Sequence, residues 1–299
     1  MSFSITVCIP VFNQYIADLA AVLAYQVSGA TIPVVVFFGD DASEEKFRKL
    51  NRPVMAKYGF VYEEMPENTG RARMRNYMAE KANTSHVLFL DGDTIIEHSD
   101  FLVNYIESLL QAPDTVFCGG TYFQPRNYDK NKMLHWTYGT KVVAGLHSRR
   151  DLEGRFHFMA SNFLIKKEYF EQVRFQEDLR DYGHEDTIFG HELRSANIDV
   201  EGIDNQVLHG SLDTNKEFLD KVSHLVLNLK KLKKSGQYEE ALAEIRLVKA
   251  ARNVKKCGLR APYLWLFDGI STLVAKNLNG SKPSLGLLNM YKLYLFLKN

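Results

Sequence analysis

Two carboxylates separated by one glycine are the strongest chemical signal in the chain. The segment LFLDGDT, residues 88–94, ends an apolar run with Asp91, Gly92 and Asp93. Residues two apart on a strand point to the same side, and glycine permits the turn that brings both carboxylates toward one ion. Such oxygen ligands suit Mg²⁺ or Mn²⁺, which also binds diphosphates. Taken alone, the motif fits an acidic loop that caps a helix better than it fits a metal site.

A second acidic pair lies in YGHEDTIFGHEL, residues 182–193, where Glu185 and Asp186 follow Gly183. Carboxylates are stabilised at the start of a helix, so capping explains the pair without any chemistry. The functional interpretation is a general base that takes a proton from an attacking hydroxyl. Alone, the motif favours neither interpretation.

A third group of polar residues precedes both acidic motifs. It comprises Phe12 in CIPVFN, Asp40 and Asp41 in GDDAS, and three arginines in ENTGRARMRN. An aromatic ring can stack on a base, a carboxylate can bind ribose or a base edge, and an arginine can pair with a phosphate. For any single residue, a helix cap or a solvated helix face is the more common explanation. The arginines are Arg71, Arg73 and Arg75.

The elements that must position these residues alternate along the chain. Apolar, β-branched runs predict strands at residues 4–10, 33–38, 60–64 and 86–90, and helices are expected at 16–27, 44–58 and 70–82. This alternation is typical of a doubly wound α/β sheet, in which ligands bind beyond the carboxyl ends of the strands. Further strands are expected at 116–123 and 156–165, and a helix begins at Lys167.

The chain changes character after residue 214. Residues 221–299 hold 15 Lys and Arg against 4 Asp and Glu, a balance of +11, so the first 220 residues carry −10. Two basic amphipathic helices are expected at 216–234 and 238–255, and residues 285–297 are apolar. Attachment to anionic lipid and a helical lid with a solvated lysine face are equally good interpretations. The residues that suggest attachment are Lys230, Lys231, Lys233, Lys234, Tyr263, Trp265 and Phe267.

Length and composition restrict the class of protein. A chain of 299 residues with 45% hydrophobic residues can bury a substantial core, which argues against disorder. The three cysteines are widely spaced, which argues against a disulfide framework and points to a reducing cytosol. We find no signal-peptide pattern and no apolar stretch long enough to span a membrane. A cytoplasmic protein, with a peripheral position on the inner face of the membrane as an option, is therefore expected. Nucleic-acid binding is not expected, because no such motif accompanies the basic charge.

The motifs CIPVFN, FFGDDAS, ENTGRARMRN, LFLDGDT and GHEDTIFGHEL together resemble those of the family 2 glycosyltransferases, in the same order and spacing, over residues 4–212. The resemblance implies the GT-A fold, an α/β architecture with a mostly parallel central sheet flanked by helices and, here, a C-terminal helical extension. It implies a catalytic domain at 1–213, with a nucleotide-binding half at 1–99 and an acceptor-binding half at 100–213. The remaining residues, 214–299, form a basic helical region.

The resemblance also assigns roles to residues. Asp186 is the expected catalytic base, and Glu185 holds the acceptor or orients the site. Asp93 is the main metal ligand, for Mn²⁺ or Mg²⁺, with Asp91 and His209 beside it. A lone histidine is more often structural, but His209 follows a strand-like segment at the matching position. The nucleotide-binding residues are Pro10, Phe12, Asn13, Asp40, Asp41, Asn68, Arg75, Asp91 and Gly92. The expected acceptor-binding residues are Trp136, His157, Ser161 and Asn162.

The activity implied is inverting transfer of a sugar from a nucleotide-diphosphate donor, with UDP-sugar favoured. The acceptor is a hydroxyl of a saccharide or lipid-linked saccharide, in the synthesis of bacterial surface polysaccharide or glycoconjugate. The GHED segment is similar to that of bacterial galactosyl and N-acetylhexosaminyl transferases, although His184 stands where a glycine is common, which leaves the donor sugar open. The alternatives are an inactive sugar-nucleotide-binding scaffold and a nucleotidyltransferase, which would normally carry a glycine-rich basic loop near the first strand.

Overall fold

A computed structural model of the chain describes residues 3–127, 129–146, 148–149, 156–178 and 183–298. Contacts divide the chain into two compact units, neither of which is continuous in sequence. Unit 1 comprises Met1–Tyr122, Ala144–Arg180 and Phe189–Ser211. Unit 2 comprises Phe123–Val143, Asp181–Ile188 and Leu212–Asn299.

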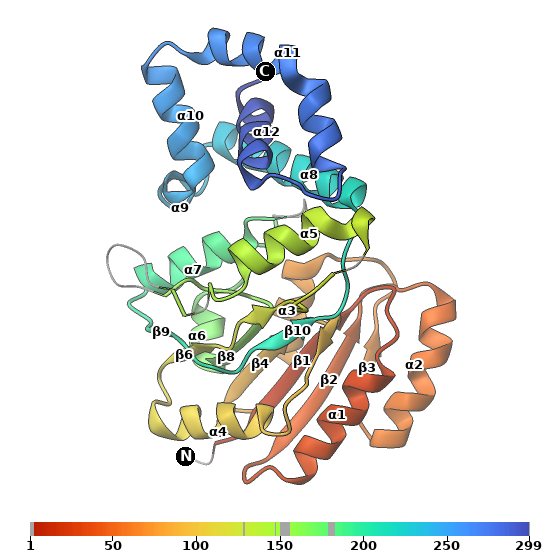
Figure 1. Cartoon of the computed structure of the whole chain (residues 1–299). Helices are drawn as coiled ribbons and strands as arrows, with labels where there is room; N and C mark the ends of the chain where they lie inside the picture. The colour runs from red at the N-terminus through yellow and green to blue at the C-terminus, as the bar shows by residue number, and fades with distance from the viewer. Residues whose placement is uncertain (1–2, 128, 147, 150–155, 179–182, 299) are drawn as a thin grey trace. The chain divides into compact units, whose positions relative to one another are not determined.

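The centre of unit 1 is a seven-stranded sheet within the described part of the chain, in the order β3-β2-β1-β4-β8-β6-β9 (Figure 1). Neighbouring strands are parallel except where β8 pairs antiparallel with β4 and with β6. The strands are β1 (Ile5–Val11), β2 (Val34–Asp40), β3 (Val61–Glu64), β4 (His86–Leu90), β6 (Val116–Cys118), β8 (Asn162–Lys166) and β9 (Val200–Gly202). The α/β fold with a mostly parallel sheet is thus confirmed.

Alternate residues of the central strands pack into two separate cores, as the two-residue period of a strand requires. In β1, Ile5, Val7 and Ile9 pack in one core, and Cys8 packs in the other. The first core is covered by α1 (Ala17–Ser28), α2 (Glu45–Tyr58) and α4 (Phe101–Gln111). The second is covered by α3 (Arg71–Lys81), α6 (Lys167–Gln172) and the end of α7 (Glu185–Ser195). Continuous burial of β4 explains its unbroken apolar sequence.

A small second sheet brings distant segments to the end of β4. Its order is β5-β10-β7, formed by β5 (Thr94–Ile95), β10 (Val207–His209) and β7 (Thr121–Tyr122). The antiparallel pairing of β10 with β5 sets His209 opposite Thr94. Because Thr94 directly follows Asp93, this pairing delivers His209 to the acidic motif.

The strands expected at 116–123 and 156–165 differ from the observed ones. The first is interrupted at Gly119 and Gly120, so that β6 and β7 belong to different sheets. A Cβ atom on Gly119 would lie 2.5 Å from the Asn205 carbonyl oxygen, and Gly120 has φ of 76°. The close approach and the positive φ force the chain to turn there. The second strand, β8, begins only at Asn162.

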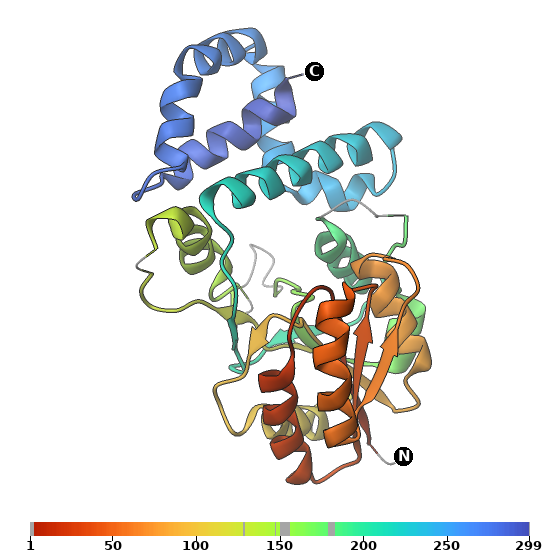
Figure 2. The same ribbon diagram turned by 90° about the vertical axis from the view of Figure 1, so that its right-hand side faces the viewer.

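Unit 2 is helical in its described residues. It contains α5 (Met133–Tyr138), a π-helical turn (Gly139–Val143), the start of α7 and the C-terminal helices, with α8 as a single long helix (Figure 2). Its core gathers apolar residues of α5, α8, α11 and α12. The C-terminal helices are α8 (Asn215–Ser235), α9 (Glu239–Glu244), α10 (Arg246–Lys256), α11 (Arg260–Leu278) and α12 (Leu285–Leu297). The single helix expected at 238–255 is broken at Ile245, which is extended. Within the described residues, no helix is both long enough and apolar enough to cross a membrane.

Candidate active site

The acidic motif lies at the carboxyl end of β4, beside the end of β1. A Cβ atom on Gly92 would lie 2.9 Å from the carbonyl oxygen of Pro10, so only glycine passes this point without displacement. The amide of Asp91 donates to the Ser161 carbonyl oxygen at 3.0 Å, which ties the motif to the residue just before β8. Pro10, Asp91 and Gly92 are therefore brought together as the sequence predicted.

Arg75 is a buried cation that contacts the first carboxylate. Its side chain is 2% exposed, and Nη2 donates to Asp91 Oδ1 at 2.8 Å. The guanidinium lies 5.3 Å from the centroid of the Phe175 ring. Its Nε and Nη1 groups have no hydrogen-bond partner among the described residues. A buried guanidinium with donors left over is suited to an additional anion, such as a phosphate.

Asp93 and His209 form the second contact of the motif. Asp93 Oδ2 lies 3.5 Å from His209 Nδ1 and accepts from Ser211 Oγ at 3.3 Å. Burial raises the pKa of Asp93, while the charge of His209 lowers that pKa and the charge of Asp91 raises it. The Gly210 amide donates to the Asp93 carbonyl oxygen at 2.8 Å, and a Cβ atom on Gly210 would lie 2.5 Å from that oxygen.

The donor set fits a hard divalent cation in part. Two carboxylates and an imidazole belong to the same region of unit 1. Burial disfavours the negative charge of Asp93, and a bound cation would offset that cost. Among the described residues, no group of three or more His, Cys, Asp or Glu side chains is arranged to hold a metal by itself. A bound metal would thus need further oxygen ligands from outside the protein, as Mg²⁺ commonly obtains from phosphates.

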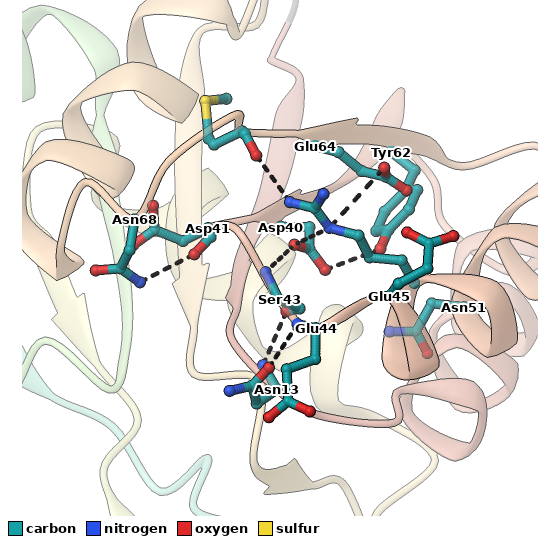
Figure 3. Close-up of polar contacts among 12 residues, drawn as sticks. Asn13, Asp40, Asp41, Ser43, Glu44, Glu45, Asn51, Tyr62, Glu64 and Asn68 are labelled. Carbon is teal, nitrogen blue, oxygen red and sulfur yellow. Dashed lines mark hydrogen bonds and ion pairs between the residues drawn. The ribbon is translucent and has the colours of Figure 1, made fainter.

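Asp40 is entirely buried, and both oxygens of its carboxylate accept hydrogen bonds from within the protein (Figure 3). Oδ1 accepts from the Ser43 amide at 2.7 Å and from Arg48 Nε at 3.2 Å. Oδ2 accepts from the Tyr62 hydroxyl at 2.9 Å. These bonds fix the turn between β2 and α2. Burial, and then the hydrogen bond to Asp40, raises the pKa of Tyr62. Sequence reasoning did not single out Arg48 and Tyr62, since neither belongs to a motif.

Asp41 joins the end of β2 to the start of α3. Oδ1 accepts from the Thr69 amide at 2.6 Å and from its hydroxyl at 2.8 Å, and Oδ2 accepts from the Gly70 amide at 2.9 Å. Asn68 Nδ2 donates to the Asp41 carbonyl oxygen at 2.9 Å (Figure 3). The structure therefore brings Asp41 and Asn68 together across 27 residues of sequence.

The residues after β1 contact the loop between β2 and α2. Asn13 has φ of 51°, its amide donates to Ser43 Oγ at 2.8 Å, and its Oδ1 accepts from the Glu44 amide at 2.8 Å (Figure 3). The side chain of Phe12, by contrast, is 54% exposed. An exposed aromatic ring is available to stack on a planar ligand.

The predicted acceptor-binding residues of unit 1 are placed differently from one another. Asn162 is completely buried: its Oδ1 accepts from the Tyr105 hydroxyl at 2.7 Å, and its Nδ2 donates to the carbonyl oxygens of Gly120 and Asn205. Ser161 is half-buried, and its hydroxyl lies 3.1 Å from Thr121 Oγ1. The side chain of His157 is exposed.

In unit 2, Glu185 and Asp186 occupy the first turn of α7, and both are half-buried. The residues before them are held by α8: His184 Nε2 lies 3.2 Å from the Leu225 carbonyl oxygen, and Asn228 Nδ2 donates to the Gly183 carbonyl oxygen at 3.3 Å. His184 has φ of 76°, a value that favours the glycine expected there. Burial lowers the pKa of His184.

Trp136, also in unit 2, lies in α5 and is half-buried. Its Nε1 donates to the Gln124 carbonyl oxygen at 2.8 Å.

Comparison with known proteins decides the family. The model of the family described as Glycosyl transferase family 2 matches residues 6–174, which include most of β1, the Asp40–Asp41 loop, α3 and the Asp91–Asp93 motif. The chain belongs to this family. Among curated proteins, none matches the sequence significantly.

Solved structures of low identity share the GT-A fold of this family 2 glycosyltransferase. A mannosyltransferase from Pyrobaculum calidifontis, in complex with GDP-Man and Mn²⁺, is 15% identical with a TM-score of 0.57, and the match covers 99% of this chain and 88% of that one. Glucosyl-3-phosphoglycerate synthase from Mycobacterium tuberculosis, with Mn²⁺ and UDP, is 12% identical with a TM-score of 0.53, over 76% and 80%. The match to S. aureus TarS 1–349, at 16% identity and a TM-score of 0.49, covers 77% of this chain and only 65% of that one.

Proposed function

We propose that this family 2 glycosyltransferase transfers a sugar, with inversion, from a nucleotide-diphosphate donor, UDP-sugar being favoured. The acceptor is a hydroxyl of a saccharide or lipid-linked saccharide, in bacterial surface polysaccharide or glycoconjugate synthesis. The observation that carries the proposal is the grouping of Arg75, Asp91, Asp93 and His209, which combines a buried guanidinium with two carboxylates and an imidazole. Structures that share the fold hold UDP or GDP-Man together with Mn²⁺.

The nucleotide side of the proposed site is built on the loops after β1 and β2. Phe12, exposed next to Pro10, stacks on the base. Asn68 and the backbone of Asp41 and Asn13 supply polar contacts, and Asp91 with Gly92 lies against the ribose. Asp40 is entirely buried and accepts three hydrogen bonds within the protein, so its proposed role is to hold the loop in place.

The diphosphate lies between Arg75 and Asp93 in this proposal. The unpaired Nε and Nη1 groups of Arg75 donate to phosphate oxygens, and Asp93, Asp91 and His209 would hold Mn²⁺ or Mg²⁺. When bound, the metal neutralises the charge that develops on the departing diphosphate.

On the acceptor side, Asp186 removes the proton of the attacking hydroxyl. The hydroxyl oxygen bonds to the anomeric carbon as the bond to the diphosphate breaks, so configuration inverts without a covalent intermediate. Glu185 orients the acceptor, and Trp136, His157 and Ser161 contact it. Asn162 positions Ser161 from within the core, since its amide is already bonded to three other groups. A lipid-linked acceptor would place the enzyme at the inner face of the cytoplasmic membrane.

The metal and nucleotide assignments are tested by calorimetry of UDP binding with and without Mn²⁺. We expect Mn²⁺ to strengthen UDP binding to the wild type and to have little effect on Asp93→Ala, because the main metal ligand is missing. Asp114→Ala, which removes an exposed carboxylate that pairs with Lys166, is the control. If Asp93→Ala retains the full Mn²⁺ dependence, the metal role of Asp93 is wrong.

The base assignment is tested by Asp186→Asn in a screen of nucleotide release from UDP-, GDP- and TDP-sugars with saccharide acceptors. Base catalysis contributes roughly 10²–10⁴-fold, so we expect a loss of turnover of that order with nearly unchanged UDP affinity. The corresponding change at the preceding residue, Glu185→Gln, should instead raise the KM for the acceptor. Near-wild-type turnover in Asp186→Asn would exclude Asp186 as the base.

A further inference from the structure

Helix α11 of unit 2 carries two apolar stripes, and only one of them is packed. Phe267, Val274 and Leu278 are 2%, 3% and 1% exposed and belong to the core that α11 shares with α12. Residues that lie on a different side of the same helix are Trp265 and Leu273, which are 79% and 68% exposed.

The exposed residues recur with helical spacing. Trp265 and Leu273 are eight positions apart, and Leu266, 52% exposed, lies next to Trp265. Positions separated by seven or eight residues share one side of a helix. Single exposed apolar residues are ordinary, but large apolar residues that recur on one side of a helix indicate an interaction surface.

Exposed cations lie before and after this stripe in the sequence. Arg252, Lys255 and Lys256 are exposed near the end of α10, directly before α11, and Lys276 is exposed in the last turn of α11. Within the described residues, none of these four side chains has an acidic partner within ion-pair distance. The acid on α11, Asp268, accepts from the Tyr294 hydroxyl and lies 3.9 Å from Lys298 Nζ, so its charge is partly balanced.

We propose that α11, with the adjoining end of α10, is a docking surface for an anionic lipid membrane. Trp265, Leu266 and Leu273 enter the boundary between headgroups and acyl chains, and the four cations meet the anionic headgroups. An indole suits this boundary because its ring is apolar while its N–H group remains hydrated. The charge pattern favours a lipid surface over a second copy of the chain, which would present the same cations.

The structure changes which residues carry this role. Phe267 stacks on Tyr294 with ring centroids 4.3 Å apart and is buried, so it is a core residue. Lys230 of the lysine cluster on α8 donates to the carbonyl oxygens of Leu295 and Lys298. The docking surface is therefore assigned to Trp265 and its neighbours on α11.

Cosedimentation of the full chain with vesicles tests the proposal. We expect binding to vesicles of phosphatidylglycerol and phosphatidylcholine in equal parts, and none to phosphatidylcholine alone. Replacing Trp265 and Leu273 together by serine should weaken partitioning by about tenfold or more, because most of the inserted apolar area is lost. Tyr25→Ser with Leu110→Ser, a pair 72% and 52% exposed in unit 1, should bind like the wild type.

A fluorescence measurement locates the contact. The chain has two tryptophans, so Trp136→Phe leaves Trp265 as the reporter, and its emission should shift to the blue on anionic vesicles. Lys255→Glu with Lys256→Glu should reduce binding, whereas Lys49→Glu, an exposed charge on α2, should not.

Absence of vesicle binding by the wild type, or equal binding by the Trp265/Leu273 variant, would overturn the proposal. A wild-type dimer that this variant converts to a monomer would also overturn it, since a second copy would then cover the stripe. These measurements need no donor or metal, and UDP affinity of the variant should equal that of the wild type. Failure of membrane docking is thus distinguishable from failure of the proposed sugar transfer.

Discussion

At the scale of single residues, two glycines determine how the chain passes Asp93. Gly92 touches the Pro10 carbonyl oxygen, and Gly210 touches the Asp93 carbonyl oxygen, at distances that exclude a Cβ atom. The neighbour in both cases is backbone, which cannot rotate aside as a side chain can. The positions of Asp93 and His209 therefore depend on residues that carry no functional group.

Gly210→Ala should separate β10 from the acidic motif. The added Cβ atom would lie 2.5 Å from the Asp93 carbonyl oxygen, so β10 must shift and carry His209 with it. We expect a loss of unfolding free energy of about 1–3 kcal/mol and weaker Mn²⁺-dependent UDP binding by calorimetry. Gly269→Ala is the matched control, because an added Cβ there meets nothing within 4 Å inside a helix. That change should stabilise the protein by about 0.5–1 kcal/mol, and a similar result for Gly210→Ala would contradict the close approach.

Arg75→Lys should weaken nucleotide binding although the positive charge is retained. Lysine cannot contact Asp91 and a phosphate through one planar fork, and it loses the guanidinium contact with the Phe175 ring. We expect UDP affinity to fall by about tenfold or more, measured by calorimetry. Arg73→Lys, two positions away on the same helix and half-exposed beside Glu177, should have little effect. Equal affinities for the two variants would remove Arg75 from the diphosphate site.

The sequence predicts which site residues lie at the ends of neighbouring strands. It does not predict which polar residues are buried and hydrogen-bonded within the protein. Asp91, Gly92 and Pro10 come together as expected, because the ends of adjacent strands meet at one edge of the sheet. Asp40 and Asn162 are polar as well, but both are buried. They accept hydrogen bonds from Tyr62 and Tyr105, which lie far away in the sequence. No local pattern reveals such long-range partners.

At the scale of elements, the carboxylate of Asp41 links the end of β2 to the first turn of α3. Asp41→Asn should loosen this link, since an amide has one acceptor oxygen and would turn its NH₂ group toward a backbone donor. We expect the free energy of unfolding to fall by about 1–3 kcal/mol, measured by denaturant titration. Asp220→Asn, an exposed position on α8, should change stability by less than about 0.5 kcal/mol. A change of that small size in Asp41→Asn would show that the Thr69 and Gly70 contacts are dispensable.

Elements with one regular environment could be predicted, and those with mixed environments could not. β4 is buried along its whole length, and its apolar run predicted its bounds as observed. Helix α11 was missed because Tyr263, Trp265 and Phe267 alternate as on a strand, while an exposed apolar stripe hides the usual amphipathic pattern. In the helix, Phe267 and Trp265 are about 200° apart, so one is buried and the other exposed.

At the scale of the whole molecule, the basic segment of the sequence and the second compact unit do not have the same bounds. The excess of basic residues is confined to the end of the sequence, and this much is visible from composition. Unit 2, however, also takes in Phe123–Val143 and Asp181–Ile188, including the start of α7 with Glu185 and Asp186. The boundary at residue 213 marks where the character of the sequence changes. As a boundary between domains it stays a prediction.

The stability of the whole chain should depend on the protonation of Lys292, a half-buried residue of α12. Its Nζ lies 4.5 Å from the centroid of the Tyr138 ring, and within the described residues no carboxylate pairs with it. Burial lowers the pKa of Lys292 to about 8. The folded protein therefore binds this proton less tightly than the unfolded chain, whose lysine has a pKa near the ordinary value of about 10.4.

Lys292→Met should accordingly stabilise the protein at neutral pH and lose that advantage in alkali. The cost of burying the charge is fully present below pH 8, and it is relieved as the pH rises from about 8 to about 10.4, because over this range the unfolded state binds more protons. The difference in unfolding free energy between variant and wild type should be at most about 3 kcal/mol at pH 7, reduced by partial exposure of the side chain and by the lost contact with Tyr138. Urea titrations at intervals between pH 7 and about pH 10 measure this difference, with Lys216→Met, an exposed lysine of α8, as the control. A difference that is independent of pH would show that Lys292 keeps its proton equally well in the folded and unfolded chain.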